Sequence, residues 1–120
     1  MIQLTEEQRR TREILIKYAS KGHFITYGDL IKEARLNLDM SSPYDRGLLG
    51  KILGAISDYE HSDGRPLLSS VAVSKDKHHS DGFYKLAEEL GYGKWEQLKT
   101  EYLAMTEMSK TFDYWKSHKP

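Results

Sequence analysis

Only one stretch of the 120-residue chain has the features of a β-strand, and this scarcity limits the fold to a mainly helical one. The run 67–74 is apolar, becomes β-branched toward its end and is bounded by turn residues. A single strand is not stable alone, so we expect a partner around residues 23–26, with a further extended piece near Phe83 and Tyr84 as an option. The sequence therefore predicts an α+β fold, mostly α, with a small β-sheet of two or three strands.

Capping signals predict two helices in the first third of the chain. Thr5 and Gln8 fit a capping box, which predicts a helix over 6–20 that Gly22 stops. Thr26, with Asp29 three residues later, repeats the signal and predicts a second helix of about ten residues, whose Leu30, Ile31 and Ala34 face the core.

Apolar spacing predicts the remaining helices. Between Tyr44 and Tyr59 the apolar residues recur at helical intervals and indicate the strongest core helix, with Leu48, Leu49, Ile52, Leu53 and Ile56. Residues 83–90 and the segment from Lys94 onward should also be helical. We expect a single domain over 1–120, with a winged-helix-like part over 1–75 and a C-terminal helical extension over 82–117 packed on it.

The charge balance narrows the range of partners. With 18 basic and 18 acidic residues the net charge is zero, so a nucleic-acid partner requires a local basic patch. The chain has no cysteine, which excludes disulfides and thiolate chemistry. It also lacks an apolar run of membrane-helix length and a signal-peptide pattern, so we expect a cytoplasmic protein without membrane contact.

Three motifs in order resemble the winged-helix DNA-binding domain of the O6-alkylguanine-DNA alkyltransferases and alkyltransferase-like proteins. They are ITYGDLI, RGLLGKILGAI and RPLLSSVAV, within residues 25–73. The resemblance implies minor-groove binding by the second helix. It also implies that Tyr27 helps to rotate a nucleotide out of the stack, while Arg46 fills the gap.

The sequence departs from that family in ways that bear on activity. Arg46 lies one residue too far from Gly50, and the loop before it is longer. The Cys-His-Arg positions of the family fall on Ser69, Ser70 and Val71, so alkyl transfer to cysteine is impossible. The run 64–91 also resembles stretches of small uncharacterised bacterial proteins, a resemblance that implies no activity.

We therefore expect a non-enzymatic DNA-binding module of winged-helix type. Its predicted nucleic-acid-binding residues are Tyr27, Lys32, Arg35, Arg46 and Lys51. Alternatively, Tyr27 is a half-buried aromatic beside a helix cap and Arg46 pairs with Asp45 or Glu60.

Two further features of the first half have both a binding and a structural interpretation. Residues 1–51 contain nine basic and seven acidic side chains. Such bases either gather on one side of the protein or interleave with the acids as a solvated surface. The nine are Arg9, Arg10, Arg12, Lys17, Lys21, Lys32, Arg35, Arg46 and Lys51. Gly47, Gly50 and Gly54 lie on one face of the third helix and favour a crossing helix or strand at close range, with a phosphodiester backbone as the alternative.

Two other classes of function compete with DNA binding. The aromatic C-terminal helix, with Trp95, Tyr102, Tyr114 and Trp115, could serve a protein-interaction or inhibitor module or a homodimer. A small metal-dependent nuclease ranks third and would draw ligands from His61, His78, His79 and nearby carboxylates such as Asp58, Glu60 and Asp63, near Lys75. No catalytic motif of high specificity is present, and we expect no cofactor and no bound metal.

Overall fold

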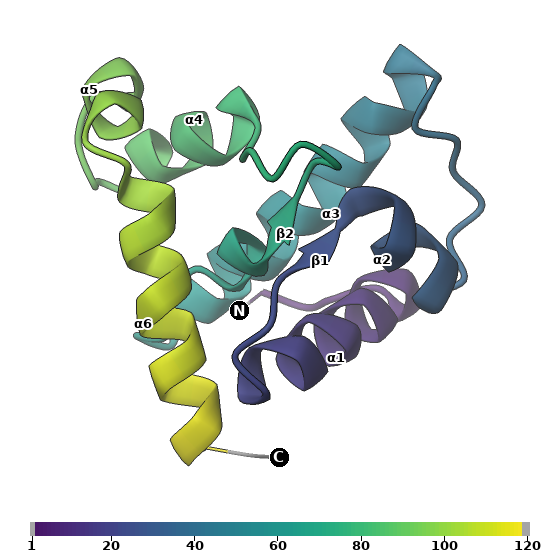
Figure 1. Cartoon of the computed structure of the whole chain (residues 1–120), viewed down its shortest axis with the longest axis horizontal. Helices are drawn as coiled ribbons and strands as arrows, with labels where there is room; N and C mark the ends of the chain where they lie inside the picture. Colours follow the sequence, from purple (N-terminus) through teal and green to yellow (C-terminus); the bar gives the residue numbers. More distant parts are fainter. Residues whose placement is uncertain (1, 119–120) are drawn as a thin grey trace.

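A computed structural model describes residues 2–118 and consists mainly of helices around one short sheet (Figure 1). The elements are α1 Glu6–Ser20, β1 Ile25–Thr26, α2 Tyr27–Glu33, α3 Pro43–Ser62, the 3-10 helix η1 Leu68–Val71, β2 Ala72–Val73, α4 Asp81–Glu89, α5 Trp95–Thr100 and α6 Leu103–Ser117. The prediction of a mostly helical α+β fold is confirmed. Among these residues no helix combines the length and apolarity needed to cross a membrane.

The first two helices begin where the capping signals predict. The Thr5 side chain accepts from the Gln8 amide at 3.2 Å, while the Gln8 side chain accepts from the Thr5 amide at 2.9 Å. Thr26 accepts from the Asp29 amide at 3.3 Å and starts α2, which is shorter than expected. Gly22 follows α1 with φ +72°, a conformation that favours glycine.

The sheet has two short strands, of which one was predicted too long. β1 and β2 pair in parallel, with Ile25 opposite Ala72, so the predicted partner around 23–26 is confirmed. Residues 68–71, however, form η1 rather than a strand. Phe83 and Tyr84 do not extend the sheet, because they belong to the helix α4, where their side chains are buried.

Helices on either side of η1 explain why it is not extended. Ser57 on α3 accepts a hydrogen bond from the Ser69 amide at 3.0 Å, and the Glu107 carboxylate on α6 accepts one from the Leu67 amide at 3.1 Å. These side chains satisfy buried polar groups that a strand would leave to a ladder partner. The packing of three helices therefore overrides the local β-preference of this segment.

Two apolar clusters hold the helices together. The larger joins α1, α2 and α3 to η1 and includes Trp115 of α6, while the smaller joins Phe83, Tyr84, Leu98 and Ala104 of the C-terminal helices to Leu67. α6 runs beside the end of α1 (Figure 1). Because Leu67 and Trp115 each belong to the cluster of the other half, the C-terminal helices are tied to the first three.

A buried carboxylate connects α1 to the end of α3. Glu60 is fully buried and forms ion pairs with Arg12 and Arg65, whose guanidinium carbons lie 5.1 and 5.4 Å from the centre of the Tyr59 ring. Burying a charge is costly unless it is paired, so each group in this network depends on the others.

The loop between β2 and α4 is held down by a histidine. The Nε2–H of His79 donates to the Ser70 carbonyl at 2.6 Å, and the ring lies 5.6 Å from that of Phe83. Burial lowers the pKa of His79 below its usual value; the hydrogen bond to Ser70 acts in the opposite direction, and His78 adds to the lowering.

We expect Glu60→Gln to lower the free energy of unfolding by about 3 kcal/mol, because two guanidinium groups lose their shared anion. Urea unfolding measures this change. The matched control is Glu6→Gln, which removes an exposed carboxylate 3.7 Å from Arg10 and should have little effect. Equal effects of the two substitutions would contradict a structural role for Glu60.

His79 should make stability depend on pH. Its pKa is lower in the folded than in the unfolded chain, so the unfolded chain binds more protons and the free energy of unfolding falls as pH drops below about 6.5. Urea unfolding between pH 7 and 5 should show a weaker dependence for His79→Gln than for the parent protein. His23→Gln, which alters an exposed histidine, should keep the parent dependence; a parent-like slope in His79→Gln would exclude this origin.

Candidate nucleic-acid interface

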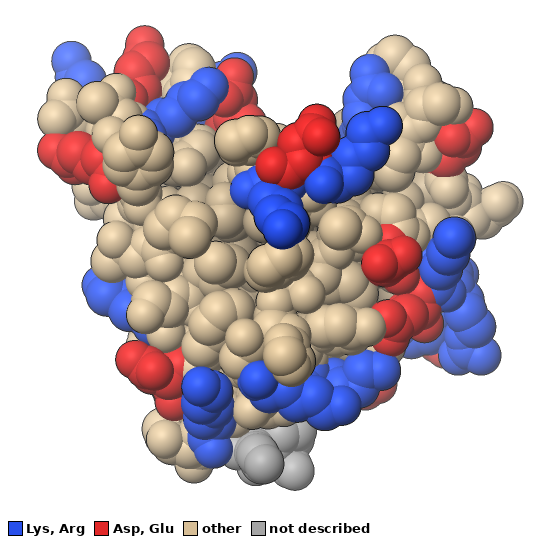
Figure 2. Space-filling view, in the orientation of Figure 1, with Lys and Arg blue, Asp and Glu red and all other residues tan. Residues whose placement is uncertain are grey.

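A groove separates α3 from the start of α4. Its cavity measures about 330 Å³. The hollowed upper edge of the molecule in Figure 2 lies between these two helices. The lining residues are Tyr27, Gly47, Gly50, Lys51, Leu53, Gly54, Ser69, Ser80, Gly82, Phe83, Lys85, Leu86 and Glu89. Helices α2, α3 and α4 thus contribute to one concave surface, called here the α3–α4 groove.

Three of the five α3 residues that line the groove are glycines, so part of this wall is backbone without side chains. A Cβ atom placed on Gly47, Gly50 or Gly54 would meet no atom within 4 Å. The expectation that a crossing helix or strand packs against these glycines is therefore wrong. Each glycine costs about 1 kcal/mol relative to alanine inside a helix, and no packing within residues 2–118 offsets that cost.

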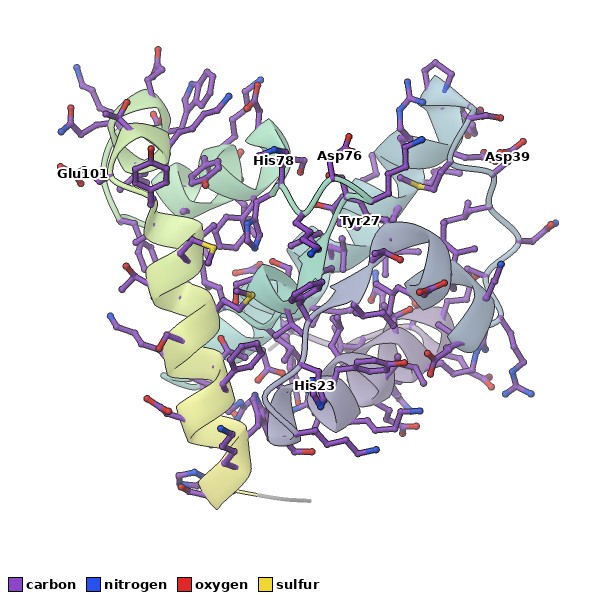
Figure 3. All side chains as sticks on the ribbon, viewed as in Figure 1. His23, Tyr27, Asp39, Asp76, His78 and Glu101 are labelled. Atoms are coloured by element: carbon purple, nitrogen blue, oxygen red, sulfur yellow. The ribbon has the colours of Figure 1, made fainter. Side chains whose placement is uncertain are left out.

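Tyr27 connects two sides of the groove. Its ring packs against the larger apolar cluster, and its hydroxyl oxygen accepts from the Ser80 amide at 3.3 Å, just before α4. Figure 3 shows Tyr27 close to the loop that carries Asp76 and His78. No acceptor within residues 2–118 takes the hydroxyl hydrogen, so this group can still donate to a ligand.

Two lysines give the groove a positive charge. Lys51 comes from α3 and Lys85 from α4, and neither forms an ion pair with a carboxylate of the described chain. The Lys85 ammonium lies 5.1 Å from the centre of the Trp95 ring. Glu89 is the carboxylate among the lining residues.

The other predicted binding residues lie outside this lining. Arg46 donates to the Met40 carbonyl at 2.8 Å rather than pairing with Asp45 or Glu60, and its spacing of four from Gly50 extends the same face of α3. Lys32 and Arg35 are exposed at the end of α2 away from Tyr27. The structure thus brings together Tyr27 and Lys51, places Arg46 on the face of α3 that carries Gly50 but outside the groove lining, and separates Lys32 and Arg35 from the groove.

Bases of α1 interleave with acids. Arg12 binds Glu60, Lys17 binds Glu33 at 3.0 Å, and Arg10 lies 3.7 Å from Glu6. In the view of Figure 2 the centre of the face is largely uncharged, and the blue and red side chains lie mainly toward its edges. Arg10 and Lys17 thus follow the solvated-surface alternative and Arg12 belongs to the buried Glu60 network, which leaves the α3–α4 groove as the better candidate interface.

The contribution of α4 was not foreseen from the sequence. Lys85 and Ser80 were not singled out, although a helix over 83–90 was expected. The spacing of the apolar residues in α4 places Lys85 on the side of the helix opposite the buried Phe83 and Ala87. It does not indicate which other helix lies next to the side that carries Lys85.

The histidines and carboxylates of the nuclease alternative do not converge. Within residues 2–118, no group of three or more histidine, aspartate or glutamate side chains could hold a metal ion. His79 binds Ser70, His61 lies 5.7 Å from the Tyr92 ring, and Asp63 pairs with Arg65 at 2.9 Å. These residues serve local contacts.

Most C-terminal aromatic residues are used in packing. Trp115 is buried and Tyr114 stacks on His118 with ring centres 4.0 Å apart. Trp95 is partly buried and contacts the smaller cluster. Tyr102 is the exception, because it remains exposed directly before α6, as does the nearby Met105.

No family model, curated protein or solved structure matches the chain. The alkyltransferase resemblance stays a prediction from three short motifs. Function must therefore be argued from the groove and its chemistry.

Proposed function

We propose that the chain is a non-enzymatic nucleic-acid-binding module whose ligand enters the α3–α4 groove with its phosphodiester backbone against α3. The observation that carries the proposal is the joint lining of one groove by bare glycine backbone, Tyr27, Lys51 and Lys85. Phosphate contacts dominate the affinity of most such complexes, and lysines without carboxylate partners suit them.

The shape of the groove favours a narrow, extended ligand. Without side chains on Gly47, Gly50 and Gly54, a backbone can approach α3 closely. Lys51 and Lys85 flank that path, and the Tyr27 hydroxyl hydrogen is available to a phosphate oxygen. Glu89 would keep anionic groups toward the α3 and Tyr27 side of the groove.

The winged-helix interpretation of residues 1–75 forms part of this proposal. Two observations support it. The helices α1, α2 and α3 are followed by the strand β2, and the motifs that resemble the alkyltransferases, within residues 25–73, lie on the elements from β1 to β2. Ser69, which stands at the cysteine position of that family, lines the same groove as Tyr27. Its Oγ is hydrogen-bonded to Ser57 at 2.6 Å, and a serine there provides no thiolate, so we propose binding without alkyl transfer.

Removing both groove lysines should weaken nucleic-acid binding. For Lys51→Ala/Lys85→Ala we expect roughly tenfold lower affinity for a short labelled oligonucleotide. The slope of the logarithm of the binding constant against the logarithm of the salt concentration should become shallower by about 1 to 2. Fluorescence anisotropy from about 50 to 200 mM salt measures both. The control Lys21→Ala/Lys32→Ala makes the same charge change outside the groove and should bind nearly as the parent does. Equal losses of affinity in the two double variants would show that net charge alone causes the effect, which would contradict binding in the groove. Absence of binding by the parent protein at low salt would overturn the proposal.

A side chain added at Gly50 should lower the affinity for nucleic acid without lowering the stability of the fold. In Gly50→Leu the new Cβ atom has open space around it and leucine improves helix propensity, so we expect the free energy of unfolding not to fall. Oligonucleotide affinity should drop at least about tenfold, since a side chain then occupies the backbone path. Gly28→Leu is the matched control, because Gly28 is also helical and unobstructed but lies outside the groove. Parent-like binding by Gly50→Leu would exclude close approach at α3.

A further inference from the structure

A second hollow lies on the other side of the residues that enter α4. It lies between the loop before α4 and the turn from α5 to α6, and its cavity measures about 810 Å³. The lining residues are Lys77, His78, His79, Tyr84, Lys99, Thr100, Tyr102 and Met105. We call it the Tyr102 hollow. Neither the fold nor the proposed groove accounts for it.

Tyr102 is exposed although most aromatic residues of this segment are packed. Its relative exposure is 71%, and that of Met105, one turn into α6, is 52%. A tyrosine so exposed gains little from burial. An aromatic face and a thioether are thus presented to solvent within one concave surface, an arrangement that suits a flat ligand.

The backbone at Tyr102 would suit glycine better than tyrosine. Tyr102 has φ +58° and Lys77 has φ +66°, so both adopt the left-handed conformation that disfavours a side chain. Within residues 2–118 only Arg35 joins them among the non-glycine residues. Two of the three line the Tyr102 hollow, and strained residues of this kind cluster at functional sites.

The charges around the hollow favour an anion. Its lining residues include the bases Lys77 and Lys99 and no carboxylate. Lys99 is paired with Asp81 at 2.7 Å, while Lys77 forms no ion pair within the described chain and lies 6.0 Å from the centre of the Phe24 ring. The ligand that fits combines a planar face for Tyr102 with a negative charge for Lys77, as a nucleotide does.

The hollow and the groove adjoin the same short segment. Ser80, Gly82 and Phe83 line the α3–α4 groove, whereas residues 77–79 and Tyr84 line the Tyr102 hollow. A nucleic-acid chain that leaves the groove across this segment would enter the Tyr102 hollow. Stacking there requires an unpaired base, because the faces of paired bases are covered within a duplex.

We propose that the Tyr102 hollow is a stacking subsite for an unpaired base, so that the ligand is single-stranded nucleic acid. This inference rests on the proposed function and names the class of nucleic acid. Tyr102 supplies the stacking face, Lys77 neutralises an adjacent phosphate, and the α3–α4 groove holds the backbone that follows.

The test is anisotropy with labelled oligo(dT) and a labelled duplex of equal length. The parent should bind oligo(dT) more tightly than the duplex, and Tyr102→Gly should lose about tenfold of its affinity for oligo(dT). Thermal unfolding of Tyr102→Gly should occur at or above the parent temperature, because glycine relieves the positive φ. Tyr102→Phe keeps the ring and should bind nearly as the parent does.

The possible failures are distinguishable. Parent-like binding of oligo(dT) by Tyr102→Gly, with the loss in Lys51→Ala/Lys85→Ala intact, would overturn the stacking subsite and leave the proposed function standing. Tighter binding of the duplex would likewise overturn the single-strand inference alone. Absence of binding to either probe would overturn both proposals. Labelled polyglutamate bound as tightly as oligo(dT), with the same loss in Tyr102→Gly, would assign the hollow to acidic polypeptides and overturn the inference.

Discussion

The buried segment 67–73 determines where the helices lie, because side chains from α3 and α6 satisfy its polar groups. The Glu107 carboxylate on α6 accepts from the Leu67 amide at 3.1 Å, and Ser57 on α3 accepts from the Ser69 amide at 3.0 Å. Buried amides without partners would cost far more than an ordinary hydrogen bond contributes, so these contacts restrict the relative placement of α3 and α6. The pairing of β2 with β1 then attaches α2 to the same segment.

Both candidate binding surfaces follow from that placement. The chain leaves β2 and enters α4 through a loop that two contacts hold: His79 to the Ser70 carbonyl, and the Ser80 amide to the Tyr27 hydroxyl. The first anchors the loop to η1 and the second to the start of α2. Because the loop is held at its last two residues, directly before α4, the α3–α4 groove and the Tyr102 hollow lie on either side of the segment that enters α4.

Local signals in the sequence predict the helix starts but not the surfaces that helices share. The caps at Thr5 and Thr26 are satisfied within four residues, so spacing alone identifies them. Whether residues 68–71 extend or coil depends on Ser57 and on α6, which are distant in sequence. The glycines of α3 pose the same problem. The spacing of Gly47, Gly50 and Gly54 indicates a helix face without side chains. Whether another helix or open space lies opposite that face depends on the position of α4, which is distant in sequence. Tyr27 and Lys51 were therefore identified without the neighbour Lys85 that completes the groove.

Electrical neutrality constrains how such a protein can hold an anionic chain. Long-range attraction increases with net charge and is screened within about 10 Å at ordinary salt, so a balanced molecule gains little from steering. Three of its four α1 bases, Arg10, Arg12 and Lys17, are also engaged by Glu6, Glu60 and Glu33. In the complex that we propose, affinity would come from short-range contacts: a few phosphates near Lys51, Lys85 and Lys77, and stacking on an aromatic face. A duplex offers charge but covers the faces of its bases, whereas a single strand offers both. The neutrality of the chain thus weighs against duplex DNA and in favour of a ligand with unpaired bases.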